Sequence, residues 1–246
     1  MHFSPRQLVT AGIVCLIWII SISCHEFAHA ITAYWGGDTS VKDKGYLTLN
    51  PFRYTSLEMT IILPAVFLLI GGFALPGAAV YIKTSALRNR FWNSAVSAAG
   101  PLATFLVTAV LAACFAQAKH IADDNLQIEL IAASAMLVYF HCASVILNLL
   151  PVPGLDGYGI IEPWLPTALR QSLARLGNAG FGLILLLLWL PGPNRVLWDA
   201  AAAMSTKLGV PAQVGELGFV LLRSSIQVWA ILIIVILYVF RRKQSA

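Results

Sequence analysis

The chain has 246 residues and a formal net charge of +5. Hydrophobic residues make up 59% of it and charged residues only 11%, whereas a soluble globular domain has about 25% charged residues. The apolar residues form long runs with short connections, so we predict an all-α integral membrane protein. Basic residues gather in short loops and at the C-terminal end, which is typical of membrane proteins and argues against nucleic-acid binding.

The apolar runs and their connections occupy nearly all of the chain, and no polar stretch is long enough for a soluble module. We therefore expect a single polytopic membrane domain over residues 1–246. Its first predicted span covers about residues 8–34 and ends at a Gly-Gly pair. Residues 45–50 alternate in character before a proline, which predicts a short β element near 45–50.

Three more apolar segments follow in the middle of the chain. The first, near 59–82, is interrupted by prolines and glycines. The second covers about 91–115 and contains Gly100-Pro101. The third covers about 128–150 and leads into a stretch broken by prolines and glycines.

The C-terminal part begins with a predicted interfacial helix over 166–176, because its leucines share one face and its two arginines lie off that face. Apolar spans are predicted at about 177–190 and 217–240, with a weakly amphipathic stretch near 195–208. In total we expect about five to six transmembrane helices.

The segment His25-Glu26-Phe27-Ala28-His29 lies inside the first predicted span. Residues four apart share one face of a helix, so two imidazoles can bind one zinc ion while the glutamate reaches the metal-bound water. Two core histidines would be the simpler interpretation in a soluble protein. In a membrane span, however, an ionisable side chain costs about 2.5–3.5 kcal/mol or more and is a functional candidate.

A catalytic zinc usually has a third protein ligand and an open position for water. Asp156 is the favoured candidate, because it follows a span in a Pro/Gly-broken stretch whose free backbone groups must line protein or a cavity. Glu58 and Glu129 are alternatives, but each flanks an apolar run, where a solvated carboxylate is the simpler interpretation.

The first motif, followed by Asn148-Leu149-Leu150-Pro151-Val152-Pro153-Gly154-Leu155-Asp156-Gly157, resembles the site-2 protease family of intramembrane zinc metalloproteases. The resemblance covers about residues 8–165, which would be the catalytic core, and leaves C-terminal helices over 166–246. It implies one Zn²⁺ ion on His25, His29 and Asp156, with Glu26 as catalytic acid/base and Asn148 near the oxyanion. It also implies that the substrates are transmembrane proteins whose peptide bonds are hydrolysed.

Some residues of the chain allow other interpretations. Thr104, Gly154 and Tyr158 differ from the residues that are commoner in the family at those places. His141 shares nearly the same helical face as Asn148 and is interpreted as a core histidine rather than a ligand. A membrane-anchored protease acting on soluble segments, or an inactive zinc-binding relative, is the competing function. An intact Glu26 counts against the inactive relative, because metal binding alone does not require it.

The ligand positions constrain the topology. His25 lies about 26 Å along the first span, near its far end, and Asp156 follows the far end of its own span. One zinc ion therefore requires the two spans to run parallel, which predicts that the segment near 59–82 is re-entrant rather than crossing. We expect five full spans in the cell membrane and an active site near the cytoplasmic side, since this arrangement places most loop Lys and Arg residues in the cytoplasm.

Overall fold

The structure, a computed structural model, describes residues 5–53, 80–118, 120–121, 123–175 and 188–223. Three helices within this part of the chain are long and apolar enough to cross a membrane: Gly12–Gly36, Arg90–Ala118 and Leu126–Asn148. These segments agree with three of the predicted spans. The predicted re-entrant segment near 59–82 and the predicted span near 177–190 lie almost wholly outside the described residues, as does most of the last predicted span.

Helix α1 (Pro5–Gly36) ends where the Gly-Gly pair predicts. Gly37 has a φ of +119°, which side-chain-bearing residues rarely adopt, and its N–H donates to the carbonyl of Tyr34 at 3.2 Å. A Cβ at this position would also lie 2.8 Å from the carbonyl oxygen of Ala86. The chain then turns into the short helix α2 (Ser40–Asp43).

The β element predicted near 45–50 is not confirmed, because the structure describes these residues and they form no strand. Gly45 turns the chain with a φ of +72°, and the N–H of Tyr46 donates back to Val41 at 2.9 Å. The Thr48 hydroxyl accepts the N–H of Asn50 at 3.2 Å. Such local bonds compete with a strand ladder, and the 3₁₀ turn η1 (Pro51–Arg53) follows directly.

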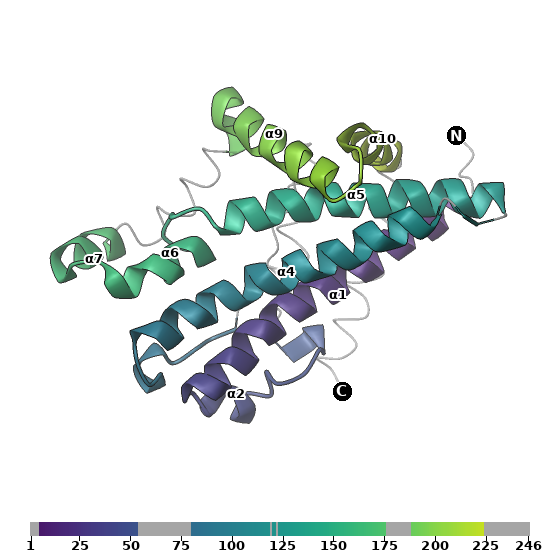
Figure 1. The fold of residues 1–246 in the computed structure, drawn as a ribbon. Helices are drawn as coiled ribbons and strands as arrows, with labels where there is room; N and C mark the ends of the chain where they lie inside the picture. Colours follow the sequence, from purple (N-terminus) through teal and green to yellow (C-terminus); the bar gives the residue numbers. More distant parts are fainter. Residues whose placement is uncertain (1–4, 54–79, 119, 122, 176–187, 224–246) are drawn as a thin grey trace.

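The long helices lie side by side, with α4 (Arg90–Ala118) between α1 and α5 (Asp124–Asn148), as Figure 1 shows. Helices α1 and α5 run in the same direction and α4 runs opposite to them. The 3₁₀ turn η3 (Thr84–Ala86) precedes α4. Asn89 and Asp123 each accept a backbone N–H in the first turn of the following helix, at 3.1 and 3.0 Å, which fixes where α4 and α5 begin.

Helix α4 has two different faces. Leu102, Leu106 and Val110 recur every four residues and are 60%, 58% and 63% exposed. An apolar stripe of this kind is unfavourable in water but suits a lipid-facing helix. In the middle of the helix the opposite face is buried and carries small and hydroxyl residues one turn apart: Gly100, Thr104 and Thr108. Small residues let membrane helices approach closely, so this face packs against its neighbours.

The remaining helices gather around α5 and around its C-terminal end (Figure 1). Beyond that end lie α6 (Asp156–Ile161), the 3₁₀ turn η4 (Glu162–Trp164) and α7 (Thr167–Ala174), the last within the predicted interfacial helix. Helices α9 (Pro191–Lys207) and α10 (Ala212–Arg223) pack against α5. There the Trp198 ring lies 5.2 Å from that of Tyr139, between centroids.

Candidate metal centre

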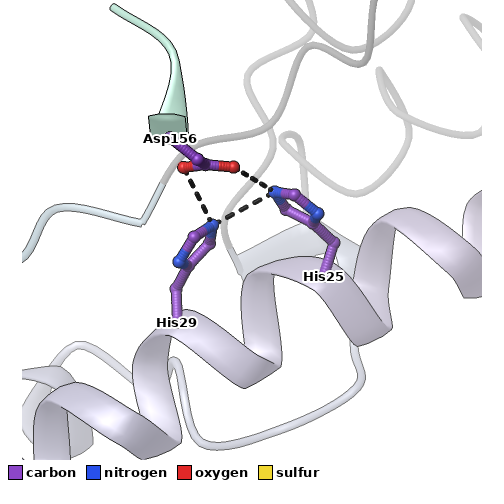
Figure 2. A group of neighbouring side chains, drawn as sticks. All are labelled: His25, His29 and Asp156. Atoms are coloured by element: carbon purple, nitrogen blue, oxygen red, sulfur yellow. Dashed lines mark hydrogen bonds and ion pairs between the residues drawn. The ribbon is translucent and has the colours of Figure 1, made fainter. Parts of the chain in front are cut away.

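His25 and His29 lie one turn apart on α1 and point to the same side, as Figure 2 shows. Their Nε2 atoms are 3.1 Å apart. Their side chains are 14% and 8% exposed. The four-residue spacing therefore places both imidazoles side by side in a mostly buried position on a candidate membrane span.

Asp156 reaches the two histidines from the first residue of α6 (Figure 2). After α5 the chain turns through Gly154, whose φ is +99°. Gly157 then packs so tightly on the end of α5 that a Cβ would lie 2.2 Å from the Leu149 carbonyl oxygen. This turn brings the carboxylate oxygens of Asp156 to 3.2 Å from Nε2 of His25 and 3.3 Å from Nε2 of His29.

The three donor groups lie close enough together to share one zinc ion. Zn–N and Zn–O bonds of about 2.0–2.2 Å in a tetrahedron place neighbouring ligand atoms about 3.3 Å apart. The two Nε2 atoms are 3.1 Å apart, and they lie 3.2 and 3.3 Å from the two different carboxylate oxygens of Asp156. One ligand atom from each residue can be chosen so that all three lie within 4.8 Å of one another. The backbone of α4 approaches the two imidazoles closely at Gly100, where an added Cβ would lie 2.2 Å from Nε2 of His29 and 2.6 Å from Nε2 of His25. The chemistry and the closeness of the donor set fit a zinc ion.

The charge on Asp156 suits this role. Burial acts to raise the pKa of the Asp156 carboxyl, but the adjacent imidazoles of His25 and His29 outweigh burial and hold the pKa below its ordinary value. The carboxyl is therefore ionised at neutral pH, as a metal ligand must be.

Helix α4 holds the other nitrogen of each imidazole. Nδ1 of His25 lies 2.9 Å from the Thr104 hydroxyl, and Nδ1 of His29 lies 2.6 Å from the Val96 carbonyl oxygen. Sequence reasoning missed both contacts. The carbonyl has no sequence signature at all. The contact of Thr104 did have a signal in the sequence. Gly100 and Thr104 are a small and a polar residue four apart in a mostly apolar segment, a spacing that indicates one packing face of a helix.

Glu26 is 5% exposed and is not one of the three close donor groups. Its Oε2 atom accepts the backbone N–H of Val80 at 3.0 Å. A neighbour of His25 that does not share the ligand position can act on a water at the metal instead.

The segment that follows Val80 is anchored by Asp38, which is 1% exposed. Asp38 accepts the N–H of Lys83 at 2.7 Å and the hydroxyl of Ser40 at 2.6 Å. Burial acts to raise the pKa of Asp38, but the hydrogen bonds from Ser40 and Lys83 outweigh it and lower the pKa below 3.8. Asp38 thus joins the end of α1 to the segment that reaches Glu26.

Other residues considered in the sequence are not part of this group. Asn148 ends α5, is partly buried and has no hydrogen bond to the three donors within the described chain. Glu129 lies near the start of α5, at the end remote from Asp156, and Glu58 lies outside the described residues. His141 is a buried core residue, as predicted, with Nδ1 2.7 Å from the Leu137 carbonyl and its ring edge-on to Trp18.

Comparison with known proteins found several relatives. Over 197 residues the chain is 39% identical to "Putative zinc metalloprotease Rip2" of Mycolicibacterium smegmatis, which covers 79% of this chain and 74% of that protein. It is 34% identical over 221 residues to the protein of the same name in Mycobacterium tuberculosis, covering 89% and 83%. It is 29% identical over 204 residues to "Putative zinc metalloprotease YwhC" of Bacillus subtilis, covering 80% and 88%. No family model and no solved structure matches the chain.

Proposed function

Since the chain belongs to the family of zinc metalloproteases that includes Rip2 and YwhC, we propose that it is an intramembrane protease that hydrolyses peptide bonds of transmembrane proteins. In this proposal His25, His29 and Asp156 bind one zinc ion. The supporting observation is that two histidines on a candidate membrane helix lie close enough to Asp156, at the start of α6, to share one ion with it, and that a buried glutamate follows the first histidine.

Glu26 is the proposed catalytic acid/base. A bound zinc would polarise the scissile carbonyl and lower the pKa of its water to about 7. Glu26 then takes a proton from the attacking water and returns it to the leaving nitrogen. The Val80 N–H, 3.0 Å from Oε2, holds one carboxylate oxygen and leaves the other for this transfer. Asn148, at the end of α5, is the proposed donor to the oxyanion.

The location of the site supports a transmembrane protein as the substrate. His25 and His29 belong to a candidate span, so a peptide bond that reaches them must enter the membrane domain. The exposed leucine and valine stripe of α4 supports a lipid bilayer as the surroundings. We further propose a multi-pass protein of the cell membrane with its active site near the cytoplasmic side, as the loop charges favour.

The test compares wild type, Glu26→Gln and Asp156→Asn, purified as full chains in detergent. One cleavable sequence is presented twice, within a transmembrane helix and within a soluble unfolded peptide. Glu26→Gln should keep stoichiometric zinc and lose about 10²–10⁴-fold in kcat, the usual contribution of a general acid/base. Asp156→Asn should lose zinc as well, because a neutral amide is a poorer ligand than a carboxylate.

Asp199→Asn is the matched control, since Asp199 is an exposed carboxylate on α9 paired with Arg195. It should leave both zinc content and cleavage unchanged. Equal cleavage by wild type and Glu26→Gln would refute the protease assignment. Cleavage of the soluble peptide alone would instead establish the membrane-anchored protease of soluble segments and refute the intramembrane substrate.

A further inference from the structure

The buried face of α4 carries two threonines, Thr104 and Thr108, one turn apart. They are 6% and 0% exposed, so each hydroxyl must find a partner inside the protein. Thr108 does this within its own helix, donating to the Thr104 carbonyl at 2.6 Å. Thr104 also bonds its own helix, but in addition it touches a proposed zinc ligand.

The contact of Thr104 with His25 has a direction. The Thr104 hydroxyl donates its single proton to the Gly100 carbonyl oxygen, 3.2 Å away, as threonines in helices commonly do. Its oxygen can then only accept from Nδ1 of His25, at 2.9 Å. In this arrangement Nδ1 carries the imidazole hydrogen and Nε2 presents its lone pair.

The second histidine provides an internal comparison. Nδ1 of His29 faces the Val96 carbonyl oxygen at 2.6 Å, and a carbonyl can only accept. When His29 binds zinc as a neutral imidazole, its hydrogen is therefore on Nδ1, and its Nε2 lone pair is left for the ion on the side where Asp156 and His25 lie. Zinc binds neutral imidazole through such a lone pair, and the partner of the other nitrogen sets which tautomer is present.

We propose that Thr104 is a positioning residue for the zinc site, which fixes the Nδ1–H tautomer and the ring orientation of His25 across the α1–α4 interface. The inference rests on the zinc binding of the proposed function. For His29 the same task falls to a backbone carbonyl, which no substitution removes. Of the two groups that contact the Nδ1 atoms, only the Thr104 side chain can therefore be tested by substitution.

The experiment measures zinc affinity of full-length protein in detergent, by competition with a chromophoric chelator. Thr104→Val keeps the shape of the side chain but removes the acceptor, so zinc should bind about 10–100-fold more weakly. Thr104→Ser keeps the hydroxyl and should bind zinc close to wild type. Thr108→Val is the matched control, because it removes the same kind of buried hydroxyl one turn away and should leave zinc affinity unchanged.

Nitrogen NMR of isotopically labelled histidine in zinc-loaded protein provides a readout that a packing role would not move. Wild type should show a hydrogen-bonded Nδ1–H on His25; Thr104→Val should shift this signal, and Thr108→Val should leave it as in wild type. Wild-type affinity in Thr104→Val, or an equal loss in Thr104→Val and Thr108→Val, would overturn the proposal. Zinc binding without cleavage would refute only the proposed protease function, whereas a wild type that binds no zinc would refute both.

Discussion

Gly100→Ala separates what helix propensity predicts from what the proposed zinc site requires. Alanine in the interior of a helix stabilises it by about 0.5–1 kcal/mol relative to glycine, so helix propensity alone predicts that the substitution stabilises α4. The added Cβ, however, would lie 2.2 Å from Nε2 of His29 and 2.6 Å from Nε2 of His25. The first distance is about 1.2 Å shorter than the 3.4 Å at which ordinary van der Waals contact begins.

A shift of that size is incompatible with zinc binding. Ligand distances in a zinc site hold to about ±0.2 Å, so a ring displaced by about 1.2 Å no longer reaches the ion in place. Removing a residue that hydrogen-bonds to a metal ligand costs about 10–100-fold in metal affinity, so displacing a ligand itself should cost at least about 100-fold. We therefore expect Gly100→Ala to remain folded but to bind zinc at least about 100-fold more weakly.

The assay combines zinc titration with thermal unfolding of the zinc-free protein in detergent. Gly12→Ala is the matched control, since Gly12 also lies in a membrane helix and a Cβ there would meet nothing within 4 Å. The control should bind zinc like wild type. Wild-type zinc affinity in Gly100→Ala would show that α1 and α4 can separate freely, and it would refute the close approach on which the site geometry depends.

Two further predictions concern stability. Hydrogen bonds lower the pKa of Asp38, so its carboxylate stabilises the folded protein above about pH 4, and this stability is lost as the pH falls through the lowered pKa. Asp38→Asn should therefore flatten the acidic part of a profile of unfolding temperature against pH. An unchanged profile would contradict this prediction. A Cβ at Gly215 would lie 2.8 Å from Cβ of Tyr139 on α5, so Gly215→Val should cost about 1–3 kcal/mol in unfolding free energy yet leave zinc affinity intact. Loss of zinc in Gly215→Val would mean that α10 supports the metal centre.

The sequence predicted those parts of the site that depend on spacing along the chain. His25 and His29 could be paired because four residues make one helical turn, and the apolar runs located α1, α4 and α5 closely. Asp156 was favoured because of the broken stretch around it. The structure then brought it to 3.2 and 3.3 Å from the two histidines.

The contacts that orient these ligands could not be predicted, because they join residues far apart in the chain. Val96 acts through a backbone carbonyl, which every residue type offers, and Val80 acts through a backbone N–H, which every type except proline offers. Thr104 was noted only as a departure from a family pattern, and its partner lies on another helix. The β element near 45–50 is not confirmed for a related reason: alternation cannot supply a partner strand, and local turn bonds form at these residues.

The close packing of the turn that carries Asp156 could not be predicted from spacing along the chain. Asp156 lies eight residues beyond Asn148, where α5 ends, yet its carboxylate oxygens lie 3.2 and 3.3 Å from the two histidines. The chain between them turns through Gly154, whose φ is +99°. Gly157 permits this packing, because only a residue without a side chain can lie against the Leu149 carbonyl at the end of α5.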